Sequence, residues 1–313
     1  MPALAQARPA ATPVAQAVVQ PSCPPAPQPF TDHEIEAGQR QARDRGFLFR
    51  VSKDDRVSYL YGTTHVARRD WVFLGPKVLE AMGTVDRVAL ELDLSDAEVL
   101  QRLRSAIRWH TKVPPLPDEI ARRLDAARAA ACADDLAGLR PEFQALGLTS
   151  LALRQDGFDP VYAIDAVVAE YAASLGKPTA GLELPEQQVA FIVRDDASGM
   201  AEVVTSLLDE LTRPQGRTQI LRLMRAWDAG DLTDISRYEV WCDCLNTPFE
   251  RAQWVQLLDE RNPGMVEQVV RWHQAGERVF VAVGALHLVG AQGLPALLEA
   301  EGFRVERVLY PRQ

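Results

Sequence analysis

The sequence predicts an α/β fold with a mixed central sheet, built from N-terminal and C-terminal strands, and a large helical insertion between them. Three observations lead to this prediction. Apolar runs with the composition of strands cluster towards both ends of the chain, and the middle has a helical pattern that prolines interrupt. Helix-start signals also follow several of the strand runs. We therefore expect a Pro/Ala-rich linker over residues 1–43 and one domain over residues 44–313, with the insertion at about 95–176.

The domain begins with a hairpin signal. Alternating apolar residues at 47–51 and 57–61 flank a charged turn at 53–55, a pattern typical of two antiparallel strands. The elements expected next are a helix at 76–82 that Pro76 starts, a strand at 87–94, and a helix beginning at Ser95, where Ser95 and Glu98 fit a capping box.

The second half of the domain carries a short strand, several helices and two final strands. Thr247, Pro248 and Glu250 combine a cap, a first-turn proline and a capping-box glutamate, and Asn262-Pro263 repeats the cap-plus-proline pattern. The expected strands are at 178–183, 278–283 and 303–309, and the expected helices are at 186–194, 200–211, 215–229, 264–274 and 294–300.

Charge and motif content exclude several classes of function. The chain has 34 Lys and Arg against 43 Asp and Glu, a formal net charge of −9, so we expect no nucleic-acid partner. No P-loop, Gly-x-Ser-x-Gly or His-Glu-x-x-His motif occurs, which argues against P-loop enzymes, serine hydrolases and the common zinc-helix proteases. Residues 279–298 carry no formal charge, but glycines and a proline interrupt them, so we expect no transmembrane segment. The oligomeric state is not indicated.

The N-terminal region indicates export. Residues 9–31 are uncharged and contain seven prolines, as in an extended linker, and the Ala-rich residues 3–7 have the small-residue spacing of a signal-peptide cleavage region. The basic and apolar segments that should precede such a region are missing, so we expect a periplasmic or secreted protein whose signal peptide is incomplete or removed in this sequence. The four cysteines are Cys23, Cys132, Cys242 and Cys244. They could form disulfides or stay unpaired, and Cys242 and Cys244 could instead begin a metal site.

Two histidines stand in the same local setting, an apolar strand followed by Gly-x-x-His. These are His65 and His287, and the glycine lets the chain turn so that each histidine faces the crevice at the strand ends. Glu91 lies in an apolar strand between them, where a buried carboxylate is costly unless it is paired or coordinating. Together the three residues predict a divalent metal site with open positions for water. The alternatives are hydrogen-bonded turn histidines and a structural salt bridge from Glu91 to Arg87.

Several ordered motifs over residues 47–309 resemble the TraB/GumN family, which is related to the Tiki metalloproteases. The motifs are Tyr-Leu-Tyr-Gly-Thr-Thr-His-Val at 59–66, Val-Ala-Leu-Glu-Leu-Asp at 88–93, Gly-Leu-Glu-Leu-Pro-Glu-Gln-Gln at 181–188, Glu-Arg-Asn-Pro-Gly-Met at 260–265 and Val-Ala-Val-Gly-Ala-Leu-His-Leu-Val-Gly at 281–290. The resemblance implies a fold like that of ChaN and the erythromycin esterases. It also implies a metal-dependent hydrolase, such as a peptidase, that uses metal-activated water.

On this chain the resemblance implies metal ligands at His65, Glu91 and His287, with Mn, Co, Zn or Fe as the metal. Glu183 is then expected to be catalytic, as a fourth ligand or a base, unless it only favours the start of the next helix. Arg261 is expected to stabilise a developing oxyanion, with a surface ion pair as the alternative. Asn262 is a further binding candidate that is first expected to cap a helix.

The substrate, a peptide or a small molecule, is not specified by the sequence. Two other functions stay open beside the hydrolase. One is a non-catalytic protein that binds a metal or a tetrapyrrole in the same crevice, as the related ChaN-like proteins do. The other is an accessory factor in the production of the envelope or of exopolysaccharide, which the GumN name implies by genetic association.

Overall fold

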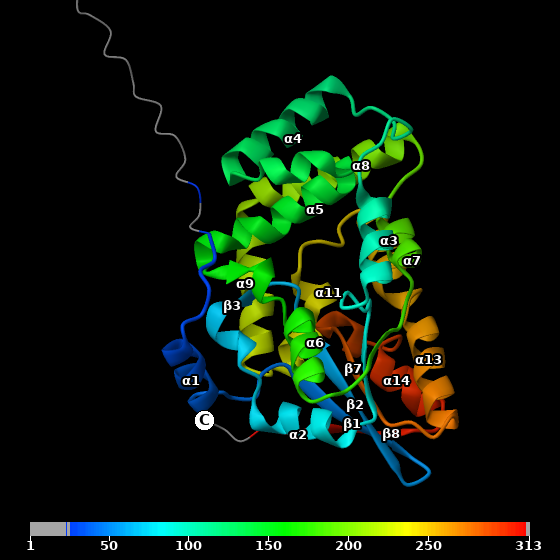
Figure 1. Ribbon diagram of the computed structural model, residues 1–313. Coiled ribbons are helices and arrows are strands. Elements are labelled where there is room, and N and C mark those ends of the chain that lie inside the picture. The colour runs from blue at the N-terminus through cyan, green and yellow to red at the C-terminus, as the bar shows by residue number, and fades with distance from the viewer. Residues whose placement is uncertain (1–22, 24–25, 311–313) are drawn as a thin grey trace, which may run out of the picture.

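A six-stranded mixed sheet forms the base of the molecule. The computed structural model describes residue 23 and residues 26–310 (Figure 1). The strands are β1 (Phe47–Lys53), β2 (Arg56–Thr63), β4 (Arg87–Leu90), β6 (Thr179–Gly181), β7 (Val279–Gly284) and β8 (Arg304–Val308). Their order in the sheet is β6-β4-β7-β2-β1-β8. Strands from both ends of the domain therefore meet at its centre, and the predicted α/β class with a mixed sheet is confirmed.

The middle of this sheet is parallel and its edge is antiparallel. β7 pairs in parallel with β2 on one side and with β4 on the other, whereas β1 is antiparallel to both β2 and β8. The side chains from Val279 to Val283 are all at most 1% exposed, as expected for a parallel strand covered on both faces. The predicted hairpin is β1–β2, and Asp54 and Asp55 at its tip have φ values of 48° and 60°, as two-residue hairpin turns require.

Several helices add buried apolar side chains to the core around the sheet. The longer ones are α2 (Pro76–Thr84), α6 (Ile164–Ser174), α9 (Pro214–Asp228), α13 (Asn262–Gln274) and α14 (Leu294–Ala300). In α9, Nε1 of Trp227 donates to the carbonyl oxygen of Gly62 in β2 at 2.8 Å. α6 contacts β4, β6 and β7, and α13 contacts β7 and α14. Their apolar side chains join those of the strands in one large core.

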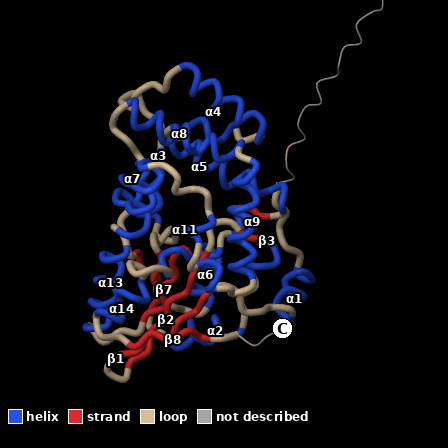
Figure 2. The backbone as a smooth tube through the Cα atoms, turned by 180° about the vertical axis from the view of Figure 1, so that it is seen from behind, coloured by secondary structure: helices blue, strands red, loops and turns tan. Residues whose placement is uncertain are grey.

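A second group of helices lies at the opposite end of the molecule from the β1–β2 hairpin (Figures 1 and 2). Its members are α3 (Ala97–Ile107), α4 (Asp118–Ala131), α5 (Pro141–Leu151), α7 (Pro185–Ile192) and α8 (Ala197–Thr212). α4, α5 and α8 enclose a separate apolar cluster that includes Leu124, Leu148 and Met200. The helical part therefore draws on residues beyond the expected insertion at 95–176, while α6, which lies inside that range, packs on the sheet.

The structure corrects three local predictions. The strand expected at 87–94 ends at Leu90, and the following helix begins at Ala97 with Asp96 as its cap, because Ser95 bonds Asp93 instead. Within the expected linker, α1 (Asp32–Arg40) forms a helix with a capping box between Thr31 and Glu34. Most of the predicted extended segment, including residues 3–7, lies outside the described residues.

The short elements complete the description. They are β3 (Ala67–Arg68), β5 (Phe158–Asp159), α10 (Leu232–Ile235), α11 (Tyr238–Trp241) and α12 (Pro248–Trp254), together with a π-helix at Val255–Asp259. The predicted capping box of Thr247 and Glu250 is present at the start of α12. Across residue 23 and residues 26–310, no helix has the length and apolar character needed to cross a membrane.

All four cysteines are paired. One disulfide joins Cys23 to Cys132 at the C-terminal end of α4, and the other joins Cys242 to Cys244. Of the three alternatives that the sequence left open, the structure has disulfides, and the possible metal site at Cys242 and Cys244 is a disulfide instead.

Candidate metal centre

The three predicted ligands lie at the same edge of the sheet. Glu91 directly follows β4, His65 follows β2 by two residues, and His287 follows β7 by three residues. Because β4, β7 and β2 are neighbours and run in parallel, their carboxyl ends meet at one edge. Residues from three distant parts of the chain are thereby brought together.

The three side chains surround the Cα atom of Gly284, the last residue of β7. A Cβ atom at this position would lie 3.3 Å from Oε1 of Glu91, 3.7 Å from Cδ2 of His287 and 3.7 Å from Nε2 of His65. Nε2 of His287 lies 3.8 Å from Oε1 of Glu91. Ligands bound to one ion at about 2.0–2.2 Å are about 3–4 Å apart, so this spacing fits a shared ion. Two imidazoles and a carboxylate suit Zn, Mn, Fe or Co.

To bind an ion, the side chains of His65, Glu91 and His287 would have to move slightly closer together. Among the residues that the structure describes, no three His, Cys, Asp or Glu side chains already stand in a ready-made coordination geometry. The open side chain position at Gly284 supplies the room that an ion would need. The donor set and its convergence are therefore compatible with a metal, and the ligands would close in on binding.

His287 is held by a hydrogen bond on its far nitrogen. Nδ1 of His287 lies 2.6 Å from Oδ1 of Asn262, whose Nδ2 donates to the carbonyl oxygen of Gln292 at 2.7 Å. Since Oδ1 can only accept, Nδ1 carries the proton and Nε2 has its lone pair free towards Glu91. Burial lowers the pKa of His287 to about 4, so the ring is neutral near pH 7, the state in which histidine binds metals.

His65 is oriented in the same way by a carboxylate. Its Nδ1 lies 3.1 Å from Oδ1 of Asp165 in α6, which leaves Nε2 facing Gly284. The Asp165 carboxylate raises the pKa of His65 to about 9 in the metal-free chain. The His65 side chain is 65% exposed, whereas that of His287 is 3% exposed, so the centre opens to solvent on the His65 side.

Glu91 is fixed by three donors. The backbone N–H of Gly284 donates to Oε1 at 2.7 Å, and Nη2 of Arg261 and Nε2 of Gln188 donate to Oε2 at 2.5 and 3.2 Å. Burial opposes ionisation, but the imidazole of His65, the guanidinium of Arg261 and the N–H of Gly284 outweigh it and hold the pKa of Glu91 well below its usual range. The alternative salt bridge to Arg87 is not formed, because Arg87 pairs with Glu277.

Arg261 and Glu183 form a buried pair behind Glu91. Nε of Arg261 donates to Oε1 of Glu183 at 3.0 Å and Nη2 donates to Oε2 at 2.6 Å, and both side chains are 9% exposed. Nη1 donates to the carbonyl oxygen of Leu257, within the π-helix Val255–Asp259 that directly precedes this region. The surface ion pair considered for Arg261 is thus a buried one, and the helix-start role considered for Glu183 is replaced by this pair.

The helix-cap prediction for Asn262 is wrong. α13 begins at Asn262 with Arg261 in the cap position, and no side chain caps this helix. Asn262 is 1% exposed, and its side-chain amide forms hydrogen bonds with His287 and with the carbonyl oxygen of Gln292. The cap-plus-proline pattern correctly predicted where the helix starts, but the Asn262 side chain bonds distant residues and does not cap the helix.

Sequence reasoning missed two residues of this centre, Asp165 and Gln188. Gln188 donates to both Glu91 and Glu183, and it belongs to the motif at 181–188 to which no role beyond Glu183 was given. Asp165 is 100 positions from His65 and stands in no motif, so no local signal could have identified it.

The fold and this site define a mixed α/β protein with a His/Glu/His cluster at the carboxyl edge of its parallel strands. The model of the TraB/PrgY/gumN family matches residues 47–307, and the chain belongs to this family. Among curated proteins it is similar to "Uncharacterized protein YbaP" of Shigella flexneri and of Escherichia coli (strain K12). Each is 24% identical over 253 residues, covering 78% of this chain and 88% of the relative. No solved structure matches the chain.

Proposed function

We propose that this protein is a metal-dependent hydrolase of amide or ester bonds, with peptides as the first substrate class to test. His65, Glu91 and His287 would hold one divalent transition metal through Nε2, Oε1 and Nε2. The observation that carries the proposal is the convergence of Oε1 of Glu91, Nε2 of His65 and the ring of His287 on Gly284, while the second nitrogen of each histidine is already bound. Turn histidines with only a structural role do not require this paired arrangement.

A bound metal would supply Lewis acidity and would lower the pKa of water at the site. The chain would supply orientation. Asn262 and Asp165 present the correct nitrogen of each histidine, and Arg261 keeps Glu91 ionised, which a metal ligand must be. Substrate would approach from the exposed side of His65.

The roles expected of Arg261 and Glu183 change in this proposal. Nε, Nη1 and Nη2 of Arg261 are all engaged with Glu183, Glu91 and Leu257, so we assign Arg261 to holding Glu91 and not to an oxyanion. The contacts of Glu183 are to Arg261 and Gln188, and we assign it to the same support. Both are therefore positioning residues.

Export to the periplasm or beyond is part of the proposal. The support is the pairing of all four cysteines, since disulfides persist in oxidising compartments and are rare in reducing ones. A cell fractionation of the producing organism would test it, with the cytoplasmic fraction as the contradicting location.

The test of the centre is elemental analysis of the tag-free protein beside the His65→Ala/His287→Ala double variant. The His110→Ala variant is the matched control, because His110 is an exposed histidine outside the centre. About one transition metal per chain, kept in the control and lost in a double variant that still folds, is the expected result. A wild-type chain that takes up none of Mn, Co, Zn or Fe would exclude the metal centre.

Hydrolysis is tested separately with the metal-loaded protein. A library of peptides and of simple esters, assayed with and without a chelator, should give turnover that the double variant lacks. Metal or tetrapyrrole binding without any turnover would instead favour the non-catalytic binding protein. A protein with neither property would favour the accessory role in envelope or exopolysaccharide production.

A further inference from the structure

The disulfide between Cys242 and Cys244 closes a very small ring. Only Asp243 separates the two cysteines, whereas Cys23 and Cys132 are 109 positions apart. A disulfide stabilises a fold mainly by restricting the unfolded chain, and this effect increases with the length of the closed loop. The Cys242–Cys244 bond therefore contributes little of this kind, and stabilisation does not account for it.

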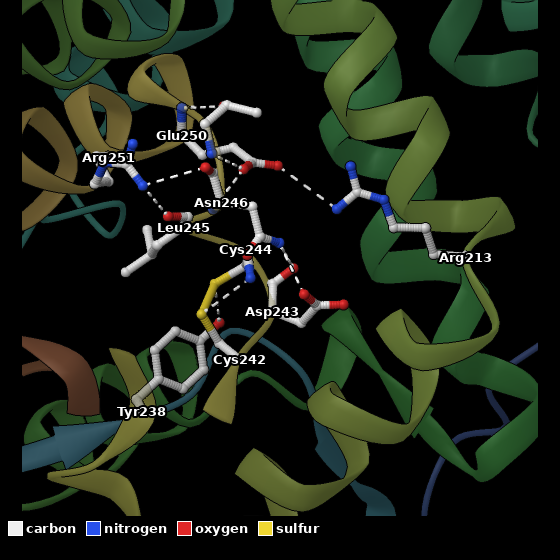
Figure 3. Close-up of a disulfide and its surroundings, with 10 residues drawn as sticks. Arg213, Tyr238, Cys242, Asp243, Cys244, Leu245, Asn246, Glu250 and Arg251 are labelled. Atoms are coloured by element: carbon white, nitrogen blue, oxygen red, sulfur yellow. Dashed lines mark hydrogen bonds and ion pairs between the residues drawn. A yellow bond between two sulfur atoms is a disulfide. The ribbon is translucent and has the colours of Figure 1, made fainter. Parts of the chain in front are cut away.

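The backbone inside the ring is held in an unusual conformation. Asp243 has a φ of 48°, in the left-handed region that residues other than glycine rarely adopt. Nδ2 of Asn246 donates to the carbonyl oxygen of Asp243 at 2.9 Å and to its carboxylate at 2.8 Å (Figure 3). Opening of the ring would release this constraint, so the protein holds the bond against a local conformational cost.

The loop that follows the disulfide is held by hydrogen bonds that do not depend on the sulfur bond. Oε2 of Glu250 accepts hydrogen bonds from the backbone N–H groups of Asn246 and Thr247, both at 2.8 Å. Nη1 of Arg251 donates to the carbonyl oxygen of Leu245 at 2.7 Å. Figure 3 shows these bonds on the side of the loop that follows Cys244. The residues that follow the ring can therefore keep their shape while the sulfur bond opens and closes.

The two sulfur atoms have different surroundings. Cys242 is 1% exposed, and Cys244 is half-buried, so an incoming thiol reaches Cys244 first. Sγ of Cys242 accepts a hydrogen bond from the backbone N–H of Cys244 at 3.2 Å, a bond that strengthens when this sulfur carries a negative charge. The Tyr238 hydroxyl lies 3.7 Å from Sγ of Cys244, and burial raises the pKa of Tyr238 to about 12, which keeps its proton available for donation.

We propose that Cys242–Cys244 is a thiol–disulfide exchange site that accepts two electrons from a pair of substrate thiols. A substrate thiolate attacks Sγ of Cys244, a bond forms between these sulfurs, the Cys242–Cys244 bond breaks, and Cys242 leaves as the thiolate. A second substrate thiolate attacks the first substrate sulfur, and Cys244 leaves. The substrate is then a disulfide and the protein a dithiol. A second disulfide compound, such as oxidised glutathione, returns the site to its starting state.

The decisive experiment is a glutathione redox titration of the full-length wild-type chain near neutral pH. After acid quenching and thiol labelling, peptide mass spectrometry reports each disulfide separately, so that Cys23–Cys132 is an internal control. The ratio [GSH]²/[GSSG] at half-reduction is expected to be at least about tenfold lower for Cys242–Cys244, because opening its ring relieves the left-handed conformation of Asp243. Circular dichroism should not change. Equal midpoints, or a loss of secondary structure in parallel with reduction, would overturn the proposal.

Two single variants test the different roles of the sulfurs. In Cys242→Ser the remaining Cys244 should form a mixed disulfide with oxidised glutathione, whereas in Cys244→Ser the buried Cys242 should react at least about tenfold more slowly. Equal rates would contradict the assignment of Cys244 as the attacked sulfur. If either variant does not fold, the wild-type titration still decides.

The source of the substrate thiols is distinguished by two probes, reduced glutathione and a reduced peptide with two cysteines. Faster oxidation of the peptide would indicate protein thiols, and faster oxidation of glutathione would indicate small thiols. If the wild-type chain oxidises neither probe faster than the Cys242→Ser/Cys244→Ser variant does, the activity is excluded. The same double variant should keep the metal content of the wild type, so failure here and failure of the proposed metal centre are distinguishable.

Discussion

Nδ1 of His287 lies 2.6 Å from Oδ1 of Asn262, and this pair decides which nitrogen of the imidazole faces Glu91. Asn262 is itself fixed by its bond to the carbonyl oxygen of Gln292. The asparagine therefore acts on the candidate metal centre through the histidine, without contact with the position of the ion.

The Asn262→Ala variant should bind metal about 10–100-fold more weakly, since loss of a partner on the far nitrogen lets the imidazole rotate. The unpaired Nδ1 should also reduce the free energy of unfolding by about 1–3 kcal/mol. Competition with a chromogenic chelator measures the affinity, and urea unfolding measures the stability. Asn246→Ala is the control, and an equal loss of affinity in both variants would refute the role of Asn262.

The Gly284→Ala variant should abolish metal uptake, because the new Cβ would lie among Glu91, His287 and His65 at 3.3–3.7 Å. Overpacking should cost about 1–3 kcal/mol of unfolding free energy. In Gly264→Ala, the matched control, the new Cβ meets no atom within 4 Å, so stability should stay equal or rise by up to about 1 kcal/mol. Full metal content in Gly284→Ala would show that the three groups do not share an ion.

The Arg261→Ala variant should lose about 3–5 kcal/mol of unfolding free energy, because it leaves the Glu91 and Glu183 carboxylates buried without their cation. Arg123→Ala removes a more exposed pair, with Asp209, and should cost less than about 1 kcal/mol. Urea unfolding of both variants compares the two costs. Similar values would mean that the buried network does not stabilise this fold.

Metal affinity should increase with pH up to about pH 9. The pKa of His65 is about 9 in the metal-free chain because of Asp165, so below this value an incoming metal must displace a proton. One displaced proton makes affinity about tenfold weaker for each pH unit below about 9. The Asp165→Asn variant removes the carboxylate that raises this pKa, so the slope between about pH 7 and pH 9 should flatten. Isothermal titration across this range measures it, and equal slopes would contradict the assignment.

The same pair has the opposite effect on the stability of the metal-free chain. The folded pKa of His65 lies above its usual value of 6.5, so the protonated pair with Asp165 stabilises the fold fully below about pH 6.5. This contribution disappears as the pH rises through about 9. Since the His65 side chain is 65% exposed, solvent screening keeps the effect small.

Local sequence patterns predicted the elements whose formation depends on near neighbours. The hairpin β1–β2 followed from alternation and a charged turn, and Thr247 capped α12 as expected. The strand predicted to reach residue 94 instead stops at Leu90. The next residue, Glu91, turns its ionised carboxylate out of the apolar run to reach the donors of Gly284 and Arg261. Composition alone does not reveal those distant donors.

The centre itself was predictable only in part. The strand-Gly-x-x-His pattern placed His65 and His287 at one sheet edge, because parallel neighbours share an edge. The groups that orient them, Asp165 and Asn262, sit on helices whose packing against the sheet is a tertiary property. No periodicity along the chain encodes such a contact.

The position of β7 has a consequence for the order of folding. This strand lies between β4 and β2 at the centre of the sheet, although almost all the other elements precede it in the chain. Until the ribosome has produced residues 279–284, β2 and β4 have no partner between them and expose unpaired edges. Such long-range parallel pairing forms slowly. An N-terminal fragment that ends before β7 should therefore be prone to aggregation and should have no metal centre at all.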